Sequence, residues 1–266
     1  MNKTLPSTPR LDAEKLVRLH TSRVEERFPR VHLISPAPSG YLLLAAEIDR
    51  RPWWFFPASS VKRQLLGRIK AQCALLAKLP GVLSAVSFRA FLGAPGGHSG
   101  YLKRRRDPAH RARFDITILI ETDSPARMAE VQRTREFQEL EADLRSSACY
   151  TEIIEARNVK RMGNVDHSVD GVFLFNFFVA DDVQQNLGVW EYTAGWFEQE
   201  THLDNSTVLL PSSPTVTSYS CINHCRWDHL SDVLPALLFK PSFHSYVLAH
   251  FNANNTAPMP IFYRLA

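Results

Sequence analysis

The chain lacks any continuous apolar stretch of the ~18 residues that a membrane-spanning helix requires. Its longest apolar runs, residues 41–46 and 172–180, have the length of strands, and Asn176 interrupts the second run. Residues 1–10 contain no apolar segment of the kind that signal peptides carry. We therefore expect a cytoplasmic protein that has no membrane partner.

Sequence motifs for nucleotide, nucleophile or zinc-protease sites are also missing. The sequence contains no Walker loop and no G-x-G-x-x-G, G-x-S-x-G or H-E-x-x-H pattern. Its four cysteines form no C-x-x-C pair, so we expect reduced thiols. Cys221 and Cys225 would lie about 13 Å apart along an extended strand, too far to share one zinc ion at bond lengths of ~2.3 Å. No metal site is predicted.

Excess charge of one sign is small. Lysine and arginine number 31 against 27 aspartates and glutamates, a net charge of +4. Much of the excess lies in the run at residues 103–106, which glycines and a proline flank. Only Tyr101 stands near it to stack on a base, so we interpret the run as a solvated loop and predict no nucleic-acid partner.

What the sequence does contain is an internal repeat. Residues 114–121 and 219–226 each read as a strand, and an aspartate that could cap a helix follows each one, Asp123 or Asp228. A helical segment comes next in both cases. The remaining expected elements are helices at residues 61–79 and 183–200, and strands at residues 82–92, 150–159, 171–179, 207–210 and 259–265. The opening strand is either residues 41–48 or residues 53–56.

The order strand, helix, strand, strand, helix, strand is ferredoxin-like. A four-stranded sheet with both helices on one face leaves its other face bare. We therefore expect an α+β fold in which two tandem halves bury those faces against each other, as an intrachain dimeric α/β barrel. The expected domains are residues 1–40, an N-terminal extension with a helix at 12–28; residues 41–165, the first half; and residues 166–266, the second half. Whether this unit forms a homodimer is open.

The end of one predicted strand and the helix after it carry a family resemblance. The strand ends in Asn-His-Cys-Arg-Trp-Asp at residues 223–228, and the helix contains Lys-Pro-Ser-Phe at residues 240–243. In this outline, over residues 169–266, the chain resembles the antibiotic-biosynthesis-monooxygenase family of dimeric α/β-barrel proteins. The likeness is fainter over residues 60–160, where Thr122 stands in place of Trp227. The superfamily includes cofactor-free oxygenases of phenolic substrates, haem-degrading enzymes, cyclases, isomerases and proteins without known chemistry, so the resemblance implies the fold and leaves the reaction open.

Strand alternation assigns side chains to the two faces of each sheet. One face of residues 114–121 is wholly apolar, and we expect it to lie under the helices: Phe114, Ile116, Ile118 and Ile120. The same register places a second set in the cavity between the sheets: Ser220, Ile222, His224 and Arg226. For residues 172–179 we expect the phenylalanine row under the helices and the other row in the cavity: Val172, Leu174, Asn176 and Phe178. A slip of one residue would reverse each assignment.

Three polar residues of this predicted cavity are the candidate catalytic group. His224 would act as a general base, Arg226 would hold a developing oxyanion, and Asn176 would orient a substrate carbonyl or dioxygen. The alternative is an internal polar network in which Arg226 pairs with Glu121 or Asp115. The expected substrate-binding residues are apolar or aromatic: Leu174, Phe178, Ile222, Tyr192 and Trp196.

These features favour a cofactor-independent enzyme, an oxygenase that acts on an aromatic or polyketide-like small molecule. The resemblance leaves a haem-binding or haem-degrading protein as an alternative, since such family members look to use an Asn, Trp and His set. Asn176, Trp190 or Trp227, and His224 could form that set. A cyclase, an isomerase and a non-catalytic ligand-binding protein are further alternatives. All of them place the chemistry on the second half.

Overall fold

The structure is a computed structural model of the chain. It describes residues 16–19, 27–49, 52, 54–97, 100–105, 109–213 and 217–266. Most of the helix predicted at residues 12–28 lies outside the described residues, as do Trp53 and Arg106.

Eight antiparallel strands close into one barrel. They are β1 (Gly40–Glu47), β2 (Val82–Gly93), β3 (Ile116–Thr122), β4 (Tyr150–Gly163), β5 (Val172–Ala180), β6 (Ser206–Pro211), β7 (Cys221–Trp227) and β8 (Thr256–Leu265). Around the barrel the order is β1-β3-β2-β8-β5-β7-β6-β4. The opening strand is thus the earlier of the two predicted candidates.

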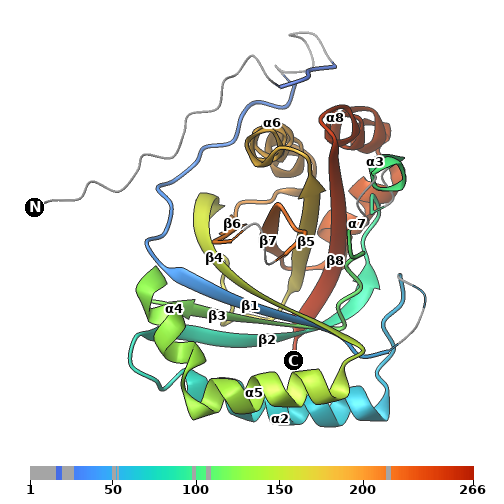
Figure 1. Cartoon of the computed structure of the whole chain (residues 1–266). Coiled ribbons are helices and arrows are strands. Elements are labelled where there is room, and N and C mark those ends of the chain that lie inside the picture. The colour runs from blue at the N-terminus through green and yellow to red at the C-terminus, as the bar shows by residue number, and fades with distance from the viewer. Residues whose placement is uncertain are drawn as a thin grey trace, which may run out of the picture.

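Helices cover two opposite sides of the barrel (Figure 1). They are α2 (Ser60–Leu76), α3 (Gly100–Arg104), α4 (Pro125–Gln132), α5 (Arg135–Ser147), α6 (Val183–Thr201), α7 (Leu230–Phe239), the π-helix η2 (Phe243–Leu248) and α8 (Ala249–Ala253). Helices α2 and α5 lie outside β1, β3 and β2, while α6 and α8 lie on the side of β5 and β8 (Figure 1). Of the helices that the structure describes, none has the length and apolar character to cross a membrane.

The predicted helix caps are wrong by one residue each. Ser124, not Asp123, is the N-cap of α4, and a proline occupies the first turn. His229, not Asp228, is the N-cap of α7. There the Asp232 carboxylate accepts a hydrogen bond from the backbone N–H of His229 at 2.8 Å, which satisfies one of the free donors of the first turn.

Three apolar layers hold the fold together. The first lies between α2, α4, α5 and the outer face of β1, β2 and β3, and is built from Leu, Ile and Phe side chains. The second fills the barrel interior with residues from all eight strands. The third lies between the second-half sheet and α6, α7, η2 and α8. Strands β1, β3, β5, β7 and β8 are therefore buried on nearly all of both faces, and they are rich in apolar residues for that reason. Strands β2 and β4 keep exposed residues.

The predicted faces are right for β3 and β7 and reversed for β5. Ile116, Ile118 and Ile120 lie under the first-half helices, as expected. In β5 it is Phe173, Phe175 and Phe177 that fill the barrel interior, while Val172, Leu174 and Phe178 face the helices. Both faces of β5 are apolar, so hydrophobicity alone could not fix its orientation.

The residues that precede β3 and β7 also depart from the predicted faces. Phe114 and Tyr219 lie in the barrel interior, although the alternation placed both under the helices. The Ser220 hydroxyl, expected in the interior, accepts a hydrogen bond from Asn186 of α6. All three residues come before the regular strands begin, so the period of two does not apply to them.

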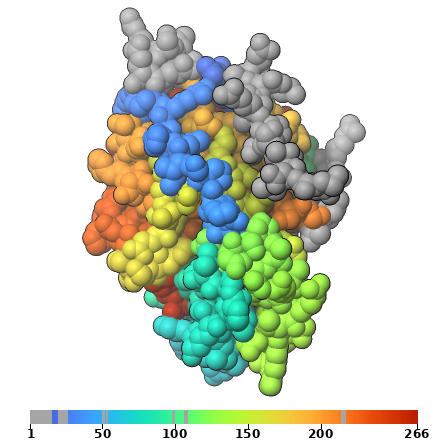
Figure 2. Space-filling view, turned by 90° about the vertical axis from the view of Figure 1, so that its left-hand side faces the viewer, coloured from blue at the N-terminus to red at the C-terminus, as the bar shows by residue number. Residues whose placement is uncertain are grey.

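The chain before β1 packs across the second-half helices. Residues 27–39 run over the surface of the barrel (Figure 2), and Phe28 and Val31 are buried in the layer under α6. A Cβ atom at Gly195 would lie 1.9 Å from the Pro29 carbonyl oxygen, so only glycine allows this close approach. Nearer the N-terminus, the Asn254 side chain makes two hydrogen bonds to the Val17 backbone.

A buried ion pair joins α2 to the strands of the first half. Lys62 Nζ lies 2.8 Å from Asp115 Oδ1, and the two side chains are 3% and 2% exposed. The second Asp115 oxygen accepts from the backbone N–H groups of Ile48 and Asp49. Asp115 was a predicted partner of Arg226, but the cation on α2 holds its carboxylate instead.

We expect Lys62→Met to lower the free energy of unfolding by about 3–5 kcal/mol, because it leaves the Asp115 carboxylate buried without its cation. Urea denaturation measures the loss. The double variant Lys62→Met/Asp115→Leu should recover much of it, because it removes both charges. Lys70→Met, on the exposed side of the same helix, is the control, and an equally small loss in both single variants would contradict the prediction.

Candidate functional site

Two adjoining cavities lie between strands β5, β7 and β8 and the helices α6, α7, η2 and α8. They are small, with about 30 and 40 Å³ open to water-sized molecules, which is room for a few waters. A larger ligand therefore fits only where the surrounding side chains move apart. The cavities share five lining residues, from β5, β7, α6 and α8: Leu174, Asn176, Phe197, Trp227 and Phe251. They lie on the helix-covered face of the sheet, not in the barrel interior where the sequence had placed the site.

The first cavity is roofed by a loop and a π-helix. Phe243, Val247 and Leu248 of η2 line it, together with the loop at residues 94–96 that follows β2. Gly96 has φ +98°, and a Cβ atom there would lie 2.9 Å from Leu248 Cδ2. Glycine thus allows the loop to close against η2. π-Helical turns occur frequently at functional sites, and here the turn aims three apolar side chains at one cavity.

Asn176 directs a hydrogen-bond donor into these apolar walls. On β8, Asn176 is opposite Pro260 and Phe178 is opposite Pro258, and neither proline has a backbone N–H. The N–H of Met259, between them, donates to Asn176 Oδ1 at 2.9 Å. A backbone N–H can only donate, so the carbamoyl oxygen must be the acceptor and Nδ2 is left over. That Nδ2 makes no hydrogen bond to any residue that the structure describes, and Asn176 lines both cavities.

Two tryptophans border the cavities from different elements. Trp227, the last residue of β7, lines both cavities and donates its indole N–H to Thr201 of α6 at 3.1 Å. Trp190, on α6, lines the second cavity. The hydrogen bond to Thr201 fixes the plane of the Trp227 ring, which then presents a rigid aromatic surface to a ligand.

His224 lies on the opposite face of the sheet from Asn176. Its partner across β5 and β7 is Phe175, whose ring it stacks on at a centroid distance of 4.0 Å. Its Nδ1 lies 3.0 Å from the Leu174 carbonyl oxygen, so Nδ1 carries the proton. Nε2 of His224 is therefore the acceptor for His167 Nε2, 2.8 Å away. The expected grouping of His224 with Asn176 in one cavity is wrong.

Burial keeps both imidazoles neutral. It lowers the pKa of His167 to about 4, and it holds the pKa of His224, which is 1% exposed, well below 6.5. Phe88 packs edge-on against both rings. A neutral histidine pair in an aromatic enclosure holds the loop before β5 against the barrel.

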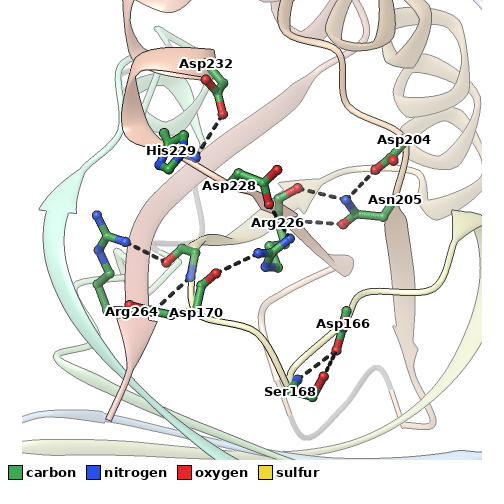
Figure 3. Close-up of polar contacts among 11 residues, drawn as sticks. Asp166, Ser168, Asp170, Asp204, Asn205, Arg226, Asp228, His229, Asp232 and Arg264 are labelled. Atoms are coloured by element: carbon green, nitrogen blue, oxygen red, sulfur yellow. Dashed lines mark hydrogen bonds and ion pairs between the residues drawn. The ribbon is translucent and has the colours of Figure 1, made fainter.

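Arg226 belongs to a polar network at the end of the barrel (Figure 3). Its guanidinium donates to the Asp170 carbonyl oxygen at 2.6 Å and pairs with Asp228 at 2.9 Å. Asn205 binds the Arg226 backbone on both sides, N–H and carbonyl, and Arg264 donates to Gly171. The expected pairing of Arg226 with Glu121 or Asp115 is therefore not seen: its acid is Asp228, two residues along the chain and 72% exposed.

The other predicted substrate contacts divide between the cavities and the core. Leu174 and Phe178 line a cavity, whereas Ile222 lies in the barrel interior. Tyr192 packs against His250, and Trp196 donates its indole N–H to Ser242. Neither the roof residues nor Asn223 had been predicted to belong to the site, although Phe243 and Asn223 stand in the sequence motifs at residues 240–243 and 223–228. The cross-strand pairing of Asn176 with Asn223 was the signal available, and it required the correct face of β5.

The lining residues do not assemble the Asn, Trp and His set of a haem protein. Asn176 and Trp227 share a cavity, but no described residue that lines either cavity is a histidine, and His224 faces away. Burial raises the pKa of the Cys225 thiol, the one lining cysteine, which disfavours a thiolate ligand. Among the described residues, no group of three or more His, Cys, Asp or Glu side chains could hold a metal ion.

This architecture defines a protein of the dimeric α/β-barrel fold, as the family resemblance implied. No protein-family description matches the chain, and no curated protein sequence does. Among solved structures, an anthrone oxidase-like protein is similar at a TM-score of 0.59 and 11% identity, covering 88% of this chain and 94% of that one. A candidate monooxygenase of Fusobacterium nucleatum is similar at a TM-score of 0.54 and 8% identity, covering 86% and 93%. A chlorite dismutase of Candidatus Nitrospira defluvii aligns at a TM-score of 0.43 and 10% identity, covering 92% and 95%.

We expect acid to destabilise the fold through the histidine pair. Both pKa values lie below the value near 6.5 of an unfolded chain, so the unfolded state binds more protons as the pH falls from about 6.5 toward 4, and stability is lost over that window. Thermal melting of the wild type and of His224→Phe across this range tests it, because the variant should lose less stability on acidification. His32→Gln, at an exposed histidine, should follow the wild type; parallel curves for all three proteins would refute the assignment.

Proposed function

We propose that the protein is a cofactor-independent oxygenase that acts on an aromatic or polyketide-like small molecule in the cavities beneath α6, α7 and η2. One observation carries the proposal: the unpaired Nδ2 of Asn176 adjoins a first cavity whose other lining residues are apolar or aromatic, and a second cavity that adds a few polar side chains. Such a site selects a flat apolar molecule that presents an oxygen acceptor at one edge. The reaction type follows the names of two proteins of this fold, the anthrone oxidase-like protein and the candidate monooxygenase.

The chemistry suits a substrate with an acidic CH₂ group beside a carbonyl or a phenol. Loss of a proton to solvent gives an enolate, and Asn176 Nδ2 donates to its oxygen. The carbanion carbon then forms a C–O bond with dioxygen from solution, and the resulting hydroperoxide loses water to leave a new carbonyl. In total, CH₂ and O₂ become C=O and H₂O, so no external reductant is consumed. A fixed donor in a water-poor cavity stabilises the developing oxyanion more than water does.

The space under the helices differs between the two halves of the chain, and this difference supports a site in residues 166–266. We infer that residues 41–165 and 166–266 are two ferredoxin-like halves, with residues 1–40 as an extension. The strand orders β4-β1-β3-β2 and β8-β5-β7-β6 correspond position by position around the barrel. Ile, Leu and Phe side chains pack the space under the first-half helices, while prolines, tryptophans and two amides line the space under the second-half helices.

We expect wild-type protein to consume oxygen with anthrone as substrate, and Asn176→Leu to lower kcat by roughly 10²–10³, the usual cost of losing one oxyanion donor. An oxygen electrode measures the rate. Asn252→Leu removes an exposed amide on α8 and serves as the matched control. His224→Phe can shift the Leu174 wall but should retain turnover, because its ring faces the barrel interior and both amides stay in place. If it abolished turnover while Asn176→Leu did not, the chemistry would lie on the other face of the sheet.

Titration with haem tests the alternative cofactor. Because no described lining residue supplies an imidazole, we expect haem to produce no Soret band with the shift and intensity of a histidine-ligated complex. Absorption spectra before and after gel filtration measure this. A stoichiometric, red-shifted Soret band that Asn176→Leu or Trp227→Leu abolished would favour the haem alternative.

A further inference from the structure

We propose that Asn223 is a second donor in the same cavity, and that Asn176 and Asn223 together bind the oxygen of a ligand that has already ionised. The proposal rests on the function proposed above and names the class of substrate: molecules acidic enough to lose a proton in water, such as acidic phenols and enolisable dicarbonyls. Amide donors bind the oxygen of a phenolate and that of an enolate equally well. The ligand class is therefore defined by what these anions share, a delocalised oxyanion on a planar group.

The two amides stand side by side. Asn176 of β5 lies directly opposite Asn223 of β7 in the antiparallel ladder, so both side chains leave the same face of the sheet, with Cβ atoms roughly 4.5–5.5 Å apart. Both residues line the second cavity. An oxygen atom placed between them is within reach of both.

Each amide is oriented through its oxygen. Met259 N–H holds Asn176 Oδ1 at 2.9 Å, and the Ser206 hydroxyl, from β6, donates to Asn223 Oδ1 at 2.6 Å. Both NH₂ groups are thereby the free ends. Within the part of the chain that the structure describes, Asn223 Nδ2 donates one hydrogen bond, to the Cys225 sulfur at 3.9 Å, a long and weak interaction. Asn223 is 7% exposed, so its donor group is withdrawn from solvent without a good partner, which is costly unless a ligand satisfies it.

The walls supply no base. Among the described residues that line the two cavities, Cys225 has the one ionisable side chain, and burial raises the pKa of that thiol. No carboxylate, imidazole, ammonium or guanidinium faces the ligand there. The cavity therefore cannot deprotonate a substrate by itself; it can only select and stabilise the anion that the ligand's own acidity produces. Two donors in an apolar surrounding are suited to that task.

Binding of a chromophoric phenol tests the amide pair. The probe is 4-nitrophenol, whose ionised form is read by its visible absorption, and 4-nitroanisole is the analogue that cannot ionise. We expect Asn223→Leu to raise the pKa of bound 4-nitrophenol by roughly one to two units over the wild-type complex, since it removes one hydrogen bond to a charged acceptor. Asn176→Leu should act in the same direction, and affinity for 4-nitroanisole should change little.

Two further variants make the test specific. Ser206→Ala leaves Asn223 in place but frees its oxygen, so we expect a smaller rise of the probe's pKa in the same direction; it also serves if Asn223→Leu does not fold. Asn252→Leu, on the exposed side of α8, should leave the probe's pKa at the wild-type value. A bound probe whose pKa responds to Asn176→Leu but to neither Asn223→Leu nor Ser206→Ala would overturn the proposal, as would wild-type protein that binds neither probe.

The outcomes separate this inference from the proposed reaction. If the probe's pKa responds to both amides while anthrone supports no oxygen uptake, the amide pair stands and the oxygenase proposal falls. If oxygen uptake depends on Asn176 but the pKa of the bound probe does not change in Asn223→Leu, the oxygenase proposal stands and Asn223 is not a second donor.

Discussion

Alternation along β5 and β7 creates two environments within the thickness of one sheet. Successive residues of a strand point to opposite faces, so Phe175 and His224 meet in the barrel interior while Asn176 and Asn223 meet beneath the helices. The closed barrel has no free edge, and both faces of β5 and β7 are covered. Everything that distinguishes the candidate site from the core depends on which of the two faces a residue occupies.

The order of the strands and of the main helices could be predicted from the sequence, and so could the orientation of β3. Strand and helix periodicity identified the regular elements, and the apolar row at Ile116, Ile118 and Ile120 was placed correctly, because its neighbours on the other face are partly polar. The face of β5 could not be predicted in the same way. One row is Phe173-Phe175-Phe177 and the other is Val172-Leu174-Asn176-Phe178, so both are largely apolar. Pairing with β7 and β8 in the folded barrel decides between them.

The prediction of the site depended on the same choice of face for β5. Asn176 stood out as one polar residue in an apolar strand, and that signal was sound. His224 stood out for its chemistry, but a histidine can also be a neutral packing residue when a carbonyl and a second imidazole satisfy its nitrogens. The roof formed by Gly96 and the π-helix depends on tertiary contacts between segments about 150 residues apart, which no local pattern announces.

The hydrogen bond from His224 to the Leu174 carbonyl has a consequence for how the protein can vary. It connects the ring packing of the interior to a backbone position whose side chain forms the cavity wall. A substitution inside the barrel can therefore displace the wall, but it cannot place a charge or a donor in the cavity, because the sheet stands between. The interior can thus adjust the size of the binding site while leaving its polarity to a handful of residues on the outer face, and selection can act on the two properties separately.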